Sequence, residues 1–144
     1  MKWILAVLVL LIPLQLAAVP TPISPGFDLK DLRCLELNIH YEARGESDKG
    51  KLAVGMVTLN RAKNKNFPKQ ICDVVYQKYQ FSWTTQFPNH SKTKVDPKIT
   101  LLAMDLLTNK YKDFTNGALY FHNAEVESFD RKVVAQIGSH TFYR

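Results

Sequence analysis

The segment LAVGMVTLN, residues 52–60, is apolar on almost every side when it is drawn as a helix. A helix without a polar face has to be buried, so this segment predicts a central helix around which the rest of the domain packs. Ser47 or Asp48 suits its start, because both side chains accept hydrogen bonds from the free amides of a first turn. We expect the helix to end near Lys63, and Gly55 to let another element approach closely.

Three further helices are predicted around this central one. The first covers residues 28–44, where Asp28 can cap the start and Gly45 can end the helix as the residue just past its last turn. A short helix is predicted within residues 68–76, after a break at a proline. The last helix opens with Asp-Pro and covers residues 96–111, because proline is favoured in a first helical turn.

Strand is predicted in three short segments. Residues 79–87, YQFSWTTQF, are aromatic and β-prone and predict a strand or a hairpin. Residues 118–122 follow an Asn-Gly turn and predict a short strand, and residues 136–143 predict a terminal one. Together with the helices, these segments predict a single helix-rich α+β domain with a small β-sheet region.

The N-terminal segment has the form of a secretory signal peptide over residues 1–18, with Lys2 before an apolar run and small residues at its end. If it is not cleaved, residues 3–18 would be an N-terminal anchor associated with the membrane. Residues 19–27 contain three prolines and predict a linker, which leaves residues 28–144 as the domain. Either way the domain is expected to be exported, to the periplasm or the extracellular space.

The net charge indicates which partners to expect. The chain carries a formal net charge of +6 at pH 7. A basic exported domain suits a polyanionic surface such as a bacterial wall, whereas export argues against nucleic acid as the partner. The alternative is that the charge serves solubility alone.

The chain has two cysteines, Cys34 and Cys72. In an oxidising compartment two cysteines most simply form one disulfide, and closing a loop of this length contributes about 3–4 kcal/mol. The alternative is a catalytic cysteine working with His122 or His140. An exported pair tends to oxidise, so the disulfide is the favoured interpretation.

One acidic residue of the helix predicted over residues 28–44 lies inside its apolar stripe. On a helical wheel Glu42 falls about 20° from Leu35, whereas Glu36 lies at the edge of the stripe and Arg44 faces the opposite way. Burial and the C-terminal end of the helix both disfavour a carboxylate anion, so we expect a raised pKa for Glu42. A carboxylic acid that is still protonated near neutral pH is what a glycosidase needs to protonate a leaving oxygen.

Two other interpretations of Glu42 remain open at this point. It could pair with Arg44, Arg61 or a backbone amide and simply brace the turn. It could also form a metal site, since His40 and Glu42 make an H-x-E pair and His122 and His140 lie downstream. A zinc site on a helix more often has two histidines four residues apart, and His40 faces away from Glu42, so we assign no metal ligand and expect no cofactor.

Two aromatic segments, YQFSW at residues 79–83 and LYFH at residues 119–122, alternate polar and apolar residues. Most of their rings are expected in the core. Gln80, Ser82 and Tyr120 could instead line a groove and form hydrogen bonds with sugars.

Several blocks together resemble the cell wall hydrolase family of the spore cortex-lytic type, the SleB/CwlJ group. The blocks are CLELNIHYEARGESDKGKLAVGMVTLNR, FPKQICDVVYQ, QFSW, GALYFHN and IGSHTFYR. Their order and spacing extend over about residues 32–144. The resemblance implies a lysozyme-like or lytic-transglycosylase-like α+β catalytic domain that acts on the glycan strands of peptidoglycan. We also expect the chain to act as a monomer.

The resemblance also implies a reaction and a set of site residues. Members of the spore type cleave between N-acetylmuramic acid and N-acetylglucosamine and leave a 1,6-anhydro end. The first glutamate of the family's E-A-R-G-E block is the catalytic acid, and it corresponds to Glu42. The candidate cleft residues are Tyr41, Gln80, Ser82, Tyr120 and His122. An N-acetylmuramoyl-L-alanine amidase and a non-catalytic wall-binding module remain the alternatives.

Overall fold

The computed structural model describes residues 26–123 and 130–144. The signal peptide predicted over residues 1–18 and nearly all of the linker predicted over residues 19–27 lie outside the described residues. Within the described part, no helix is long and apolar enough to cross a membrane. The elements, in chain order, are α1 (Leu29–Ala43), α2 (Asp48–Lys63), α3 (Ile71–Val75), α4 (Trp83–Gln86), the 3-10 helix η1 (His90–Lys92), α5 (Pro97–Leu107), β1 (Tyr120–Asn123), β2 (Val133–Ile137) and β3 (His140–Tyr143).

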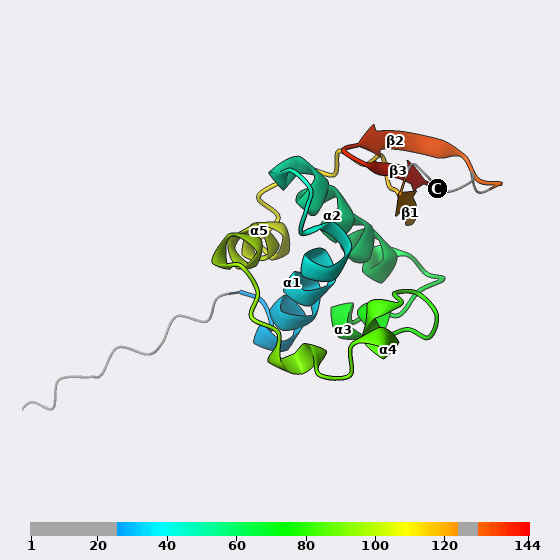
Figure 1. Ribbon diagram of the computed structural model, residues 1–144. Coiled ribbons are helices and arrows are strands. Elements are labelled where there is room, and N and C mark those ends of the chain that lie inside the picture. The colour runs from blue at the N-terminus through cyan, green and yellow to red at the C-terminus, as the bar shows by residue number, and fades with distance from the viewer. Residues whose placement is uncertain (1–25, 124–129) are drawn as a thin grey trace, which may run out of the picture.

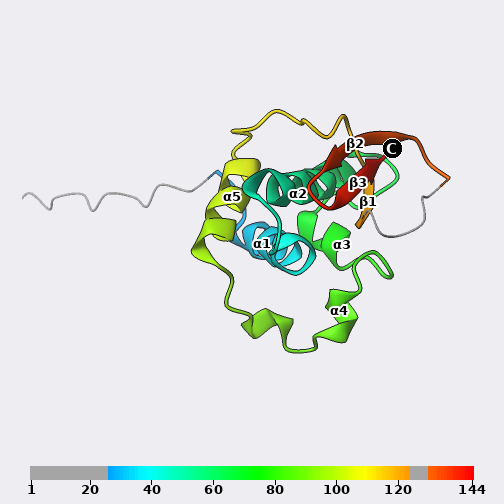
Figure 2. The same ribbon diagram turned by 45° about the horizontal axis from the view of Figure 1, so that its top comes forward.

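Helix α2 is the central element, as the sequence predicts. It packs against α1, α3 and α5, and the small sheet also lies against it (Figures 1 and 2). Ala53, Val54 and Val57 are fully buried on this helix. A side chain added at Gly55 would run into Leu106 of α5, so the missing side chain lets α5 pack closely against α2.

The start of α1 agrees with the prediction, and its end differs in detail. Asp28 caps the helix by accepting a hydrogen bond of 2.8 Å from the Lys30 backbone amide. Arg44 closes the helix in a right-handed conformation, with φ of −56°, and the Glu46 amide then bonds the Ala43 carbonyl at 2.9 Å. Gly45 follows the helix without a positive φ, so the expected left-handed glycine cap is absent at this position.

The prediction of a strand or hairpin over residues 79–87 is wrong. These residues form turns and the short helix α4, in which the Thr84 hydroxyl donates to the Phe81 carbonyl at 2.8 Å. The left-handed backbone of Tyr79, with φ of +66°, cannot belong to an extended strand. Burial of Phe81 and Trp83, which expose 4% and 2% of their surface, outweighs the β-propensity of this segment.

The sheet is three-stranded and antiparallel, in the order β1-β3-β2. The single terminal strand predicted over residues 136–143 is therefore wrong, because the chain reverses at Gly138, which has φ of +58°. Phe142 of β3 is fully buried and packs with Val54 and Val57 between the sheet and α2. The last helix, α5, ends at Leu107, earlier than predicted.

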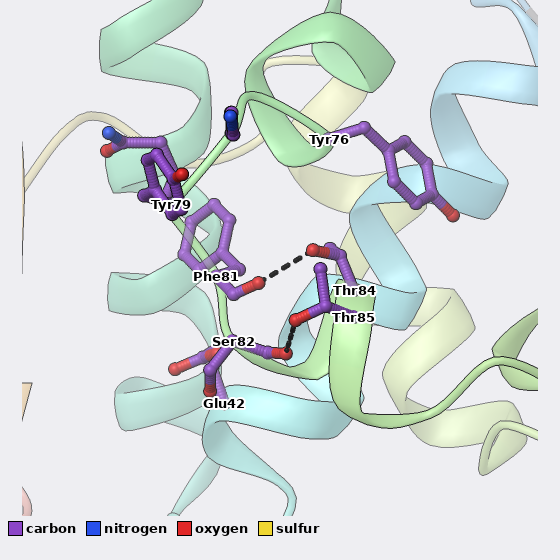
Figure 3. A pocket seen from close by; sticks show the side chains of 9 residues that line it. Glu42, Tyr76, Tyr79, Phe81, Ser82, Thr84 and Thr85 are labelled. Carbon is purple, nitrogen blue, oxygen red and sulfur yellow. Dashed lines mark hydrogen bonds between the residues drawn. The ribbon is translucent and has the colours of Figure 1, made fainter.

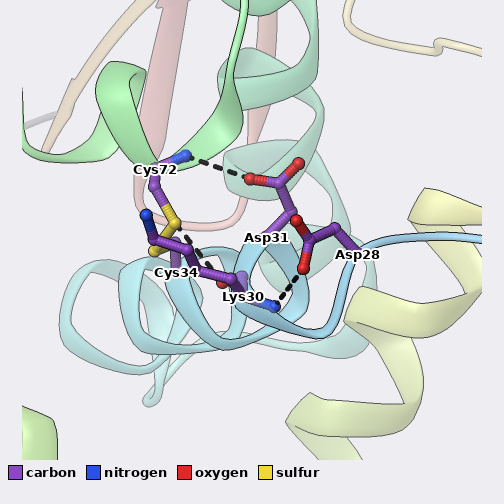
Figure 4. Close-up of a disulfide and its surroundings, with 5 residues drawn as sticks. All are labelled: Asp28, Lys30, Asp31, Cys34 and Cys72. Atoms are coloured by element: carbon purple, nitrogen blue, oxygen red, sulfur yellow. Dashed lines mark hydrogen bonds between the residues drawn. A yellow bond between two sulfur atoms is a disulfide. The ribbon is translucent and has the colours of Figure 1, made fainter.

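The predicted disulfide joins Cys34 of α1 to Cys72 of α3, 38 residues apart, with a Cα–Cα distance of 5.2 Å (Figure 4). The Cys72 backbone amide also donates to the Asp31 carboxylate at 3.4 Å. Both links tie the short helix α3 to the start of α1. The alternative of a catalytic cysteine is excluded, because neither sulfur is a free thiol.

Candidate active site

A pocket of about 600 Å³ opens between the last turn of α1 and the chain that runs from the end of α3 into α4. Figure 3 shows the side chains that line it. They are Glu42, Tyr76, Lys78, Tyr79, Gln80, Phe81, Ser82, Thr84 and Thr85. Among these described lining residues, Glu42 is the only carboxylate.

Glu42 is half-buried at the edge of this pocket. Burial raises its pKa to about 6, although the positive charge of Arg61 acts in the opposite direction. In the described part of the chain no hydrogen bond or salt bridge holds its carboxylate. The alternative that Glu42 pairs with Arg44 or Arg61 to brace the turn therefore finds no contact in this structure.

Glu42 is not the most buried acid of α1, and here the helical wheel was wrong. Glu36, expected at the edge of the apolar stripe, exposes only 7% of its surface. Its carboxylate pairs with Arg33 and accepts a hydrogen bond of 2.6 Å from the Thr100 hydroxyl of α5. Glu36 is thus a paired structural acid, whereas no described residue forms a hydrogen bond or salt bridge with the Glu42 carboxylate.

Arg61, predicted only as a possible partner for Glu42, is a further functional candidate. Its guanidinium is buried, lies 5.2 Å from the ring centroid of Phe81 and 5.5 Å from that of Tyr120, and donates through Nε to the Leu119 carbonyl at 2.7 Å. Burial lowers the pKa of Arg61 to about 10. An arginine directly after the apolar segment of residues 52–60 in the central helix was the signal that could have marked it.

The predicted cleft residues divide into two groups. Gln80 and Ser82 line the pocket together with Glu42. Tyr41 instead stacks on Trp83, with ring centroids 4.7 Å apart, and bonds Thr93 through its hydroxyl. It is therefore a packing residue on another side of α1 and not part of the described lining.

Tyr120 and His122, the other predicted cleft residues, lie on β1 and are not among the described lining residues either. Tyr120 is covered by the guanidinium of Arg131, 3.8 Å from its ring centroid. His122 Nε2 is hydrogen-bonded to the Tyr143 hydroxyl at 2.5 Å. Tyr120 therefore contacts Arg131 and Arg61 of α2, whereas His122 contacts Tyr143 of the neighbouring strand β3.

A second polar cluster joins the helices to the sheet through Glu46. Its carboxylate accepts hydrogen bonds from the hydroxyl and the backbone amide of Ser139, which lower the pKa of Glu46, and it lies 3.7 Å from His140 Nδ1. His140 is buried, and burial lowers its pKa. This cluster was missed because Glu46 and Ser139 are far apart in the sequence. In the part of the chain that is described, no three His, Cys, Asp or Glu side chains are arranged to hold a metal ion.

The sequence profile of the cell wall hydrolase family matches residues 45–143. This chain belongs to the cell wall hydrolase family. The matched range begins just after Glu42, so the family match by itself does not cover that acid.

Two curated relatives show which enzymes this cell wall hydrolase is similar to. It is 27% identical to the spore cortex-lytic enzyme of Bacillus subtilis over 135 residues, which cover 87% of this chain and 41% of that enzyme. It is also 27% identical to the spore cortex-lytic enzyme of Oceanobacillus iheyensis over 130 residues, 83% of this chain and 44% of the relative. The chain thus spans about two fifths of the length of these curated relatives.

Two solved structures share the fold of this cell wall hydrolase. The catalytic domain of the Bacillus cereus SleB protein superposes with a TM-score of 0.73 at 23% identity, covering 89% of this chain and 100% of that one. The catalytic domain of the germination-specific lytic transglycosylase SleB from Bacillus anthracis gives a TM-score of 0.72 at 24% identity, covering 88% and 100%. The predicted helix-rich α+β fold is confirmed.

Proposed function

We propose that this cell wall hydrolase cleaves the glycan strands of peptidoglycan between N-acetylmuramic acid and N-acetylglucosamine, as a lytic transglycosylase with Glu42 as its only catalytic acid. The observation that carries the proposal is the state of Glu42. Its carboxylate has a pKa raised to about 6, and it borders a pocket of about 600 Å³. A fraction of such an acid is still protonated near neutral pH, as proton donation to a leaving oxygen requires.

The proposed reaction uses Glu42 twice. As an acid, Glu42 gives its proton to the glycosidic oxygen while the bond from that oxygen to C1 of the muramoyl residue breaks. As a base, the carboxylate then takes the proton of the C6 hydroxyl of the same residue, whose oxygen forms the new bond to C1. The product is a 1,6-anhydro end, and Glu42 regains its proton.

The lining of the pocket supports a single-acid reaction. Retaining and inverting glycosidases place a second carboxylate about 5–10 Å from the first, as a nucleophile or to activate water. Glu42 is the only carboxylate among the described residues that line the pocket. Gln80 and Ser82 beside it offer the neutral hydrogen-bonding groups that sugar hydroxyls and acetamido groups need.

The site of action follows from the same proposal. The disulfide between Cys34 and Cys72 supports an oxidising location outside the cytoplasm, in the periplasm or at the wall. The proposal includes export by residues 1–18, action as a monomer and, if this segment is retained, association with the membrane. The proposal does not include nucleic acid as a partner.

Product analysis of purified peptidoglycan tests the proposal directly. Mass spectrometry should find anhydro-muropeptides with the wild-type chain and none with Glu42→Gln. Asp48→Asn is the matched control, because it removes one negative charge from an exposed residue at the start of α2. New reducing muramic ends would indicate hydrolysis and freed stem peptides an amidase, whereas wall binding without loss of turbidity would indicate a binding module. Full activity of a folded Glu42→Gln variant would exclude the assigned acid.

A further inference from the structure

Tyr79 is unusual in two independent ways. Its backbone has φ of +66°, a left-handed conformation that costs a residue with a side chain about 1–2 kcal/mol. Its side chain exposes 88% of its surface, more than any other large apolar side chain among the described residues. A ring so exposed contributes almost no burial to offset the backbone cost, so folding alone does not explain a tyrosine here.

The exposed ring of Tyr79 lies at the candidate active site. Tyr79 lines the pocket that Glu42 borders, and Figure 3 shows its ring at the edge of the group of lining side chains. Residues held in rare backbone conformations gather at ligand sites, where the surrounding structure fixes a side chain that the ligand uses. The ring is therefore presented at the rim of the pocket and not packed inside it.

The surroundings of the ring indicate what it can bind. The ammonium group of Lys78 lies 4.8 Å from the Tyr79 ring centroid and covers one face of the ring. At 88% exposure most of the rest of the ring is open to solvent. The negative face of an aromatic ring attracts polarised C–H groups, and a pyranose sugar presents one flat face of such groups. Phosphates and carboxylates would instead bind a cation and leave the open ring unused.

We propose that Tyr79 is a substrate-binding residue, on which a sugar ring of the glycan strand stacks at the rim of the pocket. This inference rests on the proposed function, since it takes the glycan strand as the ligand. It adds a contact away from the bond that is cleaved, so Tyr79 contributes to holding the strand and not to proton transfer. No role for this residue follows from the motifs of the sequence.

The test separates binding from folding by using glycine. Glycine adopts a positive φ without strain, so Tyr79→Gly should raise the melting temperature if the tyrosine has no structural role. In the full chain carrying Glu42→Gln, which prevents turnover, the dissociation constant for soluble uncrosslinked glycan strands is measured by titration calorimetry. We expect Tyr79→Gly to weaken binding about tenfold, and Tyr79→Phe to keep it within about twofold, because the ring supplies the contact.

Tyr111 provides a matched control. It is another exposed tyrosine with a neighbouring lysine, Lys110, 5.9 Å from its ring centroid, and it lines a different cavity. Tyr111→Ala should leave the dissociation constant unchanged. Unchanged binding by Tyr79→Gly, or equal losses in the two variants, would overturn the inference.

The outcome for Tyr79 is distinguishable from that for the proposed function. If the wild-type chain produces anhydro-muropeptides while Tyr79→Gly binds glycan normally, only the role of Tyr79 is wrong. If the wild-type chain neither cleaves nor binds glycan strands, the proposed function is wrong and the inference is lost with it. A lower melting temperature for Tyr79→Gly would show that the ring serves the fold.

Discussion

The indole Nε1 of Trp83 donates a hydrogen bond of 3.1 Å to the side-chain oxygen of Asn38, across 45 residues of sequence. The amide nitrogen of the same Asn38 donates to the Thr58 hydroxyl at 3.0 Å. One fully buried amide therefore connects α4 to α1 and α1 to α2. Because α1 carries Glu42 and α4 carries Thr84 and Thr85 of the pocket wall, the bond between Trp83 and Asn38 fixes this wall relative to the acid.

Replacement of Asn38 should destabilise the chain strongly. Asn38→Leu keeps the approximate volume but leaves the Trp83 indole and the Thr58 hydroxyl buried without their partner, at a cost of about 2–4 kcal/mol. Urea unfolding followed by far-UV circular dichroism measures this loss. The double variant Asn38→Leu, Trp83→Phe should lose less free energy of unfolding than the two single variants lose together, because the second change removes the unpaired indole. Strict additivity would contradict the coupling.

Activity should depend on pH through Glu42. The acid must be protonated to donate, so kcat/KM should be high below pH 6 and fall about tenfold per pH unit above it. The Arg61 charge lowers the pKa of Glu42, so Arg61→Met should move this fall to higher pH, whereas Arg61→Lys should leave it nearly in place. Cleavage of soluble glycan strands between pH 4 and 8 provides the measurement. A fall centred near pH 4.5 would mean that Glu42 behaves as an ordinary surface acid.

Glu42→Gln should make the folded chain more stable at neutral pH. Folding raises the pKa of Glu42 from 4.5 to about 6. Well below pH 4.5 the carboxyl is protonated in both the folded and the unfolded state, so its ionisation does not affect stability there. As the pH rises through 6 the folded state comes to hold an ionised, poorly hydrated group, at a cost of about 2 kcal/mol. Urea unfolding at pH 4 and pH 7.5 should show the gain from the glutamine only at the higher pH. An equal gain at both values would point to a cause other than ionisation.

Gly138 and Gly45 should respond oppositely to the same substitution. Alanine at Gly138 would be strained at φ of +58° and would collide with the Glu46 carboxylate, which would lose its bonds to Ser139. We expect Gly138→Ala to cost about 2–4 kcal/mol in the free energy of unfolding. Gly45 has no atom within 4 Å of an added side-chain carbon and no positive φ, so Gly45→Ala should be neutral or stabilising by up to about 1 kcal/mol. Thermal and urea unfolding measure the stability of the two variants. Equal changes in the free energy of unfolding would contradict the strained turn at Gly138 and its contact with Glu46.

Local signals predicted the helical half of the fold well. Asp28 and Ser47 are N-caps as expected, and the all-round apolar segment is the central helix α2. These features depend on neighbours along the chain, which the sequence displays. The segment that contains Tyr79 and Trp83 was predicted wrongly because its conformation depends on partners in α1 that no local pattern reveals.

The candidate site was predictable in part for the same reason. The position of Glu42 on α1 follows from helical periodicity, and its raised pKa agrees with the expected burial. The wheel treats one helix alone, so it could not show that Glu36 is buried by Thr100 of α5. The contacts of Arg61 and the role proposed for Tyr79 depend on segments that are distant in the sequence and meet only in the folded chain.

The order of strands in the sheet bears on how the chain folds as it is synthesised. β3, at residues 140–143, lies between β1 and β2 although it comes last of the three in the chain. A polypeptide is made from its N-terminus, so both outer strands are available before the strand that pairs with them. Until then β1 and β2 present unpaired backbone edges, which other chains can bind. The helices can assemble earlier, so residues 139–143 determine when the sheet closes and when Glu46 finds its partners Ser139 and His140.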